Sequence, residues 1–231
     1  MDSINVFVES GKRKTFVGAI DRPGWVRWGR DEATAMASLL AYGPRYAGIL
    51  NAVGIQFQPP ATAASFHVLE RHQGNATTDF GAHDIILDCD SELVNQVDFQ
   101  RWLDILQASW DAFDQAAIRA KGKTLRKGPR GGGRDLEKIK LHVLQADQAY
   151  LRRIAWRVRK MEERSILDQM DAARSMIRQA LQSAVEKGLP EKGPRGGVIW
   201  PLRFFIRRVI WHVLDHAWEI EDRLPGEMRP A

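Results

Sequence analysis

Residues 201–224, PLRFFIRRVIWHVLDHAWEIEDRL, decide how the second half of this chain folds. Apolar side chains recur there every three or four positions, which is the period of an amphipathic α-helix. The segment opens with a proline and is followed by Pro225-Gly226, so it carries start and stop signals for one helix. His212 and His216 stand four residues apart on the apolar stripe. The spacing therefore predicts two imidazoles on the same inward face.

Three more segments share this helical period. They are residues 99–120, 135–160 and 165–187, and breakers separate them. Four amphipathic helices of about 20 residues predict a helical bundle. We place it at residues 96–225, with the helices in up-down-down-up or up-down-up-down order.

The chain before the bundle is expected to form a small α+β domain over residues 1–92. The expected strands are residues 4–9, 15–20 and 66–71, and the expected helices are residues 31–41 and 44–53. Residues 23–29, PGWVRWG, are predicted to form a loop because proline and glycine punctuate them. This order of elements and the Pro-Gly turn resemble the small HicB-like fold. The resemblance implies the fold only, since no DNA-binding appendage follows and the turn carries Trp25 and Trp28.

The composition indicates the compartment and the partners to expect. One cysteine, Cys89, excludes an intrachain disulfide and fits a reducing compartment. No apolar run reaches the roughly 18 residues that a membrane span needs. We therefore expect a cytoplasmic protein without a membrane partner. The formal charge of +5 reflects basic segments at 121–134, 152–160 and 192–208. They lack interleaved aromatics and a recognition helix, so a solvated surface is favoured over nucleic-acid binding.

The hexapeptide KGPRGG occurs twice, at residues 127–132 and 192–197, each time before a helix. In an up-down-up-down bundle the two helix starts lie at the same end. The copies are either flexible linkers of similar composition or glycine-rich loops that bind an anion at one mouth of the bundle. In the second case Arg130 and Arg195 hold the carboxylate of a bound molecule.

His142 lies on the apolar stripe of the second expected helix, about two turns from its start. Together with His212 and His216 it completes a facial three-histidine set, which suits a divalent metal and leaves positions open for water or substrate. The ordinary alternative is a histidine satisfied within a core. His67, His72 and His83 show no ligand spacing, and we expect them at the surface or in turns.

A histidine in GRDLEKIKLHVL, residues 133–144, followed by the His-x-x-x-His pair resembles the DinB-like metal-binding superfamily over residues 96–224. The resemblance implies a four-helix bundle in which His142, His212 and His216 bind a divalent ion. It also implies homodimers and, in characterised members, thiol-dependent transferase or isomerase chemistry. Zinc, nickel, iron and manganese all suit such a site.

Other side chains on these helices are candidates to act beside the metal. Glu219 could orient an imidazole or serve as a base, and its alternative is a surface acid at a helix end. Tyr150 could donate a hydrogen bond, although an aromatic at core spacing usually packs. Asp215 is a weaker candidate, and Trp211 and Trp218 either shape an apolar pocket or fill the core.

Two functions remain open from the sequence. The first is a metal-dependent transferase, isomerase or hydrolase that acts on a small molecule, with a low-molecular-weight thiol implied by the resemblance. The alternative is a non-catalytic metal-binding or regulatory protein whose α+β domain is an interaction module. Absence of an obvious general base favours the alternative.

Overall fold

The computed structural model describes residues 3–127, 133–159, 164–194 and 196–225. These residues fall into two compact units, one up to Leu87 and one from Asp88 onward, and each is described by itself. Among the described residues, no helix combines the length and the apolar character needed to cross a membrane.

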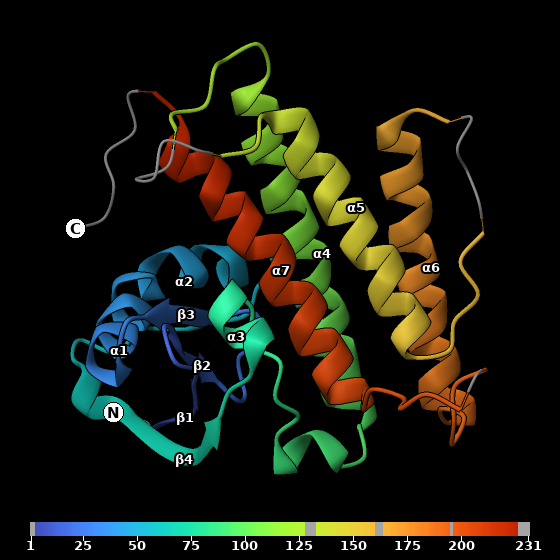
Figure 1. The fold of residues 1–231 in the computed structure, drawn as a ribbon, viewed down its shortest axis with the longest axis horizontal. Coiled ribbons are helices and arrows are strands. Elements are labelled where there is room, and N and C mark those ends of the chain that lie inside the picture. Colours follow the sequence, from blue (N-terminus) through green and yellow to red (C-terminus); the bar gives the residue numbers. More distant parts are fainter. Residues whose placement is uncertain (1–2, 128–132, 160–163, 195, 226–231) are drawn as a thin grey trace. The chain divides into compact units, whose positions relative to one another are not determined.

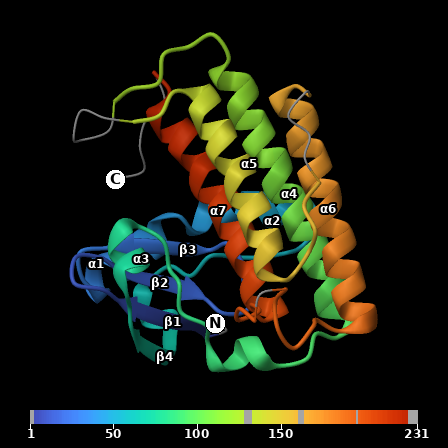
Figure 2. The ribbon, with the colours of Figure 1, turned by 45° about the vertical axis from the view of Figure 1, so that its right-hand side comes forward.

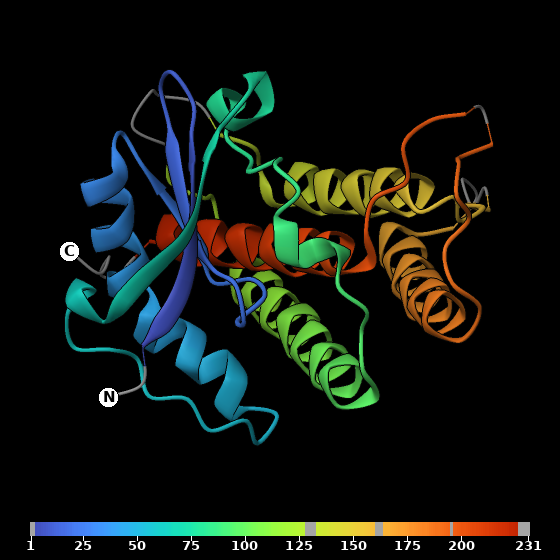
Figure 3. The ribbon, with the colours of Figure 1, turned by 90° about the horizontal axis from the view of Figure 1, so that it is seen from below.

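The first unit contains a four-stranded sheet of order β3-β2-β1-β4 (Figure 1). Its strands are β1 (Ile4–Ser10), β2 (Thr15–Ala19), β3 (Val26–Gly29) and β4 (Phe66–Gln73). β2 pairs antiparallel with β1 and β3, whereas β4 pairs parallel with β1. A parallel pair needs a crossover connection, and this one contains α1 (Glu32–Ala41), α2 (Gly43–Asn51) and the 3-10 turn η1 (Ala63–Ser65). α1 contacts β2 and β3 and lies beside one face of the sheet (Figure 3).

The loop predicted over residues 23–29 is wrong from Val26 onward, because β3 begins there. Val26 pairs with Gly18 of β2, so the β-branched and aromatic residues after the turn extend the sheet. Trp25 is fully buried, and its indole N–H donates to the carbonyl oxygen of Leu39 at 2.9 Å. The other expected strands and helices of this unit are present, with ends that differ by no more than two residues.

His83 contradicts the expectation of a surface or turn histidine. It follows α3 (Ala76–Phe80) and is fully buried, with its ring 5.7 Å from that of Phe7 and 6.1 Å from that of Phe16. The sequence around His83 has no helical or strand period that could have placed it in the core.

The second unit holds the 3-10 turn η2 (Asp88–Ser91) and four long helices. These are α4 (Gln96–Ala120), α5 (Leu136–Arg153), α6 (Ile166–Lys187) and α7 (Leu202–Arg223). Asn95, Asp135 and Ser165 cap the first three, each accepting a backbone N–H from three residues further on. The chain therefore has the α+β class expected from the sequence, with a small sheet unit followed by helices.

α5 ends well before residue 160, where its end was expected. Ala155 adopts a left-handed backbone conformation with φ of 58°, and its N–H bonds to the carbonyl oxygen of Arg152. The N–H of Trp156 bonds to the carbonyl oxygen of Leu151, which completes a Schellman motif. Glycine, the usual signal for this motif, is absent there, so the sequence did not indicate the stop.

α5 and α7 run in opposite directions. Before α5 begins, the N–H of Arg126 bonds to the carbonyl oxygen of Arg223 at the end of α7, at 2.8 Å. Before α7 begins, the N–H of Trp200 bonds to the carbonyl oxygen of Arg153 at the end of α5, at 3.0 Å. α5 also packs against α6 on its other side (Figures 1 and 2).

α4 runs parallel to α7 and antiparallel to α6. An Arg119–Glu221 ion pair joins the ends of α4 and α7, and Arg203 at the start of α7 lies 3.9 Å from Asp98 at the start of α4. Along α6, Arg174 bonds to Asp114 of α4, whereas the later Arg178 bonds to Gln107, which is earlier on α4. α4 and α7 therefore point one way, and α5 and α6 point the other.

The starts of α5 and α7, which were expected to lie at one end in an up-down-up-down bundle, lie at opposite ends. Most of the first KGPRGG copy, with Arg130, and Arg195 of the second copy lie outside the described residues. The hydrophobic period fixes which face of each helix is buried but not the direction in which it runs.

Asp147 of α5 is a buried acid in this helical core, with 3% of its surface exposed. Its Oδ1 finds no hydrogen-bond partner in the part of the chain that the structure describes. Burial raises the pKa of the carboxyl to about 7, against the opposing effect of the Arg174 guanidinium. Because the folded protein holds this proton more tightly than the unfolded chain, the stability that Asp147 contributes is complete below about pH 4 and is lost as the pH rises through 7.

We expect Asp147→Asn to remove this pH dependence. Between pH 4 and pH 7 the free energy of unfolding of the wild type should decline relative to that of the variant, by up to about 1.4 kcal/mol per pH unit. Urea denaturation at several pH values measures the difference. Asp111→Asn, at an exposed position of α4, is the matched control. Parallel pH profiles for wild type and Asp147→Asn would contradict the assignment.

Candidate metal centre

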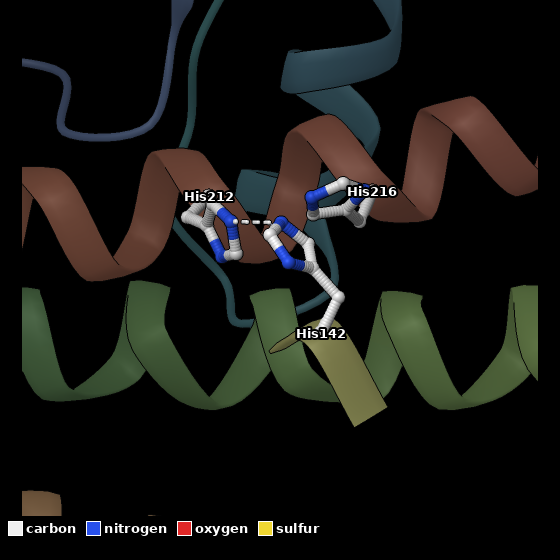
Figure 4. A group of neighbouring side chains, drawn as sticks. All are labelled: His142, His212 and His216. Atoms are coloured by element: carbon white, nitrogen blue, oxygen red, sulfur yellow. Dashed lines mark hydrogen bonds between the residues drawn. The ribbon is translucent and has the colours of Figure 1, made fainter. Parts of the chain in front are cut away.

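Three imidazoles meet where α5 crosses the middle of α7. His212 and His216 project from successive turns of α7, and His142 reaches them from α5 (Figure 4). The centroid of the His142 ring lies 5.1 Å from that of His212 and 4.9 Å from that of His216, and the last two are 4.6 Å apart. Each ring offers one nitrogen, and these nitrogens all lie within 4.8 Å of one another.

The contact between His142 and His212 has a spacing that two ligands of one metal ion would also have. The Nε2 atoms of His142 and His212 are 3.3 Å apart. In a tetrahedral zinc site, with Zn–N bonds of about 2.0 to 2.1 Å, two ligand nitrogens lie roughly 3.3 to 3.4 Å apart. Two unprotonated Nε2 atoms at this distance repel each other, so the contact needs a proton on one of them or a cation between them. The donor set and its geometry therefore fit a divalent transition metal.

Burial keeps two of these imidazoles neutral, as metal ligation requires. The pKa of His142 is lowered to about 4, mainly by burial and also by the neighbouring His216 and Arg134, against the opposing effect of Glu219. Burial also holds the pKa of His212 well below its usual range, with His216 and His142 adding to the effect. His212 and His216 expose only 6% and 7% of their surface.

Glu219 lies one turn beyond His216 and is bonded to it. Its Oε2 is 2.7 Å from Nδ1 of His216, and its Oε1 accepts a hydrogen bond from Arg223 at 2.6 Å. Burial raises the pKa of the Glu219 carboxyl, but its bonds to His216 and Arg223 outweigh burial and leave the pKa lowered. Glu219 is thus a carboxylate that contacts a candidate ligand, rather than an isolated acid at the helix end.

Two of the aromatic candidates, Tyr150 and Trp211, lie beside His212. The Tyr150 ring lies 5.7 Å from that of His212, and the guanidinium of Arg208 lies 5.5 Å from the Tyr150 ring. Trp211 and Trp218 are both 2% exposed, so they belong to the core of the helical unit. Asp215 is only partly buried and is not among the three residues whose ligand atoms converge.

Two arginines near the site were missed from the sequence. Arg223 holds Glu219, and Arg134 acts electrostatically on His142 and His212. The Glu219–Arg223 spacing of four residues is a recognised helical ion pair and could have indicated the first. Nothing in the sequence indicated the second, because its position depends on how the segment before α5 approaches α7.

Comparisons of the chain with family models, with curated proteins and with solved structures found no match.

The metal-free protein should lose stability in acid through His142 and His212. Both histidines have lowered pKa values when folded. Their contribution to the free energy of unfolding is therefore complete above about pH 6.5 and is lost as the pH falls toward 4. His142→Gln should flatten this slope in urea denaturation of metal-free protein, whereas His67→Gln, at an exposed position of β4, should not. Equal slopes for the wild type and His142→Gln would contradict the prediction.

Proposed function

We propose that the helical unit binds one divalent transition-metal ion through His142, His212 and His216, as a DinB-like four-helix metal protein. The observation that carries the proposal is the convergence of one nitrogen from each of three mostly buried imidazoles within 4.8 Å. A 3.3 Å separation of two Nε2 atoms and the lowered pKa values of their rings support it.

The preferred activity is metal-dependent chemistry on a small molecule, in the manner of a thiol-dependent transferase or isomerase. A metal held by three imidazoles supplies Lewis acidity, which polarises a substrate or lowers the pKa of bound water or thiol. Among the described residues no fourth histidine, cysteine or acid joins the cluster, and an open position is typical of catalytic sites. We expect Tyr150, whose ring lies 5.7 Å from that of His212, to donate a hydrogen bond to a molecule in the open position.

The alternative is a metal-binding protein without catalysis, with a regulatory or interaction role. The Glu219 carboxylate favours this alternative. Both of its oxygens have partners, one on His216 and one on Arg223, so it is engaged rather than poised to take a proton from a substrate.

Both candidate functions require one bound divalent ion, and the metal content of the protein tests this requirement. Protein purified without a histidine tag should contain about one zinc, nickel, iron or manganese ion per chain by elemental analysis. His142→Ala and His216→Ala should each lose it, because two imidazoles alone hold such an ion weakly. Excess zinc at about 100 times its Kd should stabilise the metal-free wild type by about 2.7 kcal/mol and should not stabilise the variants.

His72→Ala is the control for the general loss of an imidazole, since His72 bonds to Glu70 in the sheet unit. This variant should retain the metal. Folded wild-type protein that contains no metal and is not stabilised by any of the four ions would contradict the proposal.

A spectrum of the cobalt-substituted protein separates the two functions. If the metal has a position open to a thiol, adding cysteine or another small thiol should produce a sulfur-to-cobalt charge-transfer band. Tyr150→Phe should weaken the thiol affinity without loss of cobalt. A cobalt spectrum unchanged by any thiol or carboxylate favours the non-catalytic alternative.

A further inference from the structure

The two oxygens of Glu219 bind different neighbours. Oε2 contacts Nδ1 of His216 at 2.7 Å, and Oε1 accepts from Nη1 of Arg223 at 2.6 Å. A carboxylate only accepts hydrogen bonds, so the proton between Glu219 and His216 belongs to Nδ1 of the imidazole. The lone pair of His216 is then on Nε2, the nitrogen that remains for a metal.

Arg223 is itself held in place by the segment before α5. Its Nε donates to the carbonyl oxygen of Arg126 at 2.7 Å, and its own carbonyl oxygen accepts from the N–H of Arg126 at 2.8 Å. On the other side, Gly133 approaches so closely that a Cβ at this position would lie 2.5 Å from Nη2 of Arg223. Only 7% of Arg223 is exposed, so this guanidinium has little room to turn away from Glu219.

The other two histidines have no comparable support among the described residues. Nδ1 of His212 is buried without a hydrogen-bond partner there, and the contact of His142 is with His212 through Nε2. An acid therefore sets the tautomer of one candidate ligand, His216, and an arginine fixed by backbone contacts holds that acid.

We infer that Glu219 and Arg223 are positioning residues of the metal centre, which fix the His216 tautomer and couple the site to the segment before α5. The inference rests on the proposed metal function for its effect on affinity. An ordinary helical Glu–Arg pair, the competing explanation, stabilises the helix and leaves metal affinity unchanged. Contacts of this kind behind a ligating histidine typically change metal affinity 10- to 100-fold.

Two measurements on Glu219→Gln test the inference. Zinc affinity, from competition with a chromophoric chelator, should fall by about tenfold or more. The nitrogen NMR shifts of the His216 ring in the metal-free protein at pH 8 should move from the Nδ1–H tautomer toward a mixture. Arg223→Gln should cause a smaller fall in affinity, and Arg223→Lys should restore part of it.

Glu221→Gln is the matched control, because Glu221 lies on the same helix and forms an ion pair with Arg119 of α4. Its zinc affinity and His216 shifts should equal those of the wild type. The inference fails if Glu219→Gln and Glu221→Gln bind zinc equally, or if the His216 tautomer is the same in wild type and Glu219→Gln. If the wild type binds no zinc but Glu219→Gln still changes the His216 tautomer, the proposed function is overturned and the positioning contacts remain supported.

Discussion

The burial of α7 is the constraint on which the helical unit depends. Every residue from 204 to 214 is buried, so this helix is enclosed beyond the single apolar stripe that its sequence shows. A polar group on such a helix must find a partner or carry the cost of burial, about 1 to 3 kcal/mol for an unsatisfied group. Arg207 is matched by Asp90 of η2, and Arg223 is matched by Glu219 and the carbonyl oxygen of Arg126.

His212 is a polar residue of α7 that this matching leaves incomplete. His212 meets His142 nitrogen to nitrogen, and its other nitrogen is buried without a partner in the described residues. A neutral Nε2–H tautomer of one ring can donate to the other, whereas burial disfavours a doubly protonated, charged ring. The divalent ion that we propose would instead accept the Nε2 lone pairs of both neutral imidazoles. The proposed metal site rests on the convergence of three ring nitrogens within 4.8 Å more than on the His-x-x-x-His spacing alone.

Much of the arrangement was readable in the sequence because it follows from local periods. The helical repeat placed His212 and His216 on one inward face, and the same repeat on α5 placed His142 inward. The strand at Val26 was missed because a turn signal stood directly before it. The stop at Ala155 was missed because an alanine occupies a position where glycine is usual. The directions of the four helices could not be derived, since the period of a helix is the same in either direction.

The Glu219–Arg223 contacts depend on residues that are distant in the sequence. The spacing of the pair was visible, but its meaning depends on Arg126 and Gly133, which reach Arg223 through the tertiary fold. Asp147 is similar, because a single acid on a helix gives no sign of whether it is buried. Sequence periodicity thus predicted which residues point inward, whereas the partners of those residues came from packing.

An anomalous difference map from crystals grown with zinc is the sharpest test for a metal at the three imidazoles, because it locates the ion as well as detecting it. We expect one strong peak within bonding distance of a nitrogen from each of His142, His212 and His216, with Nε2 as the ligand atom of His216. A map with no peak at the three imidazoles, or with zinc bound only elsewhere, would contradict this expectation.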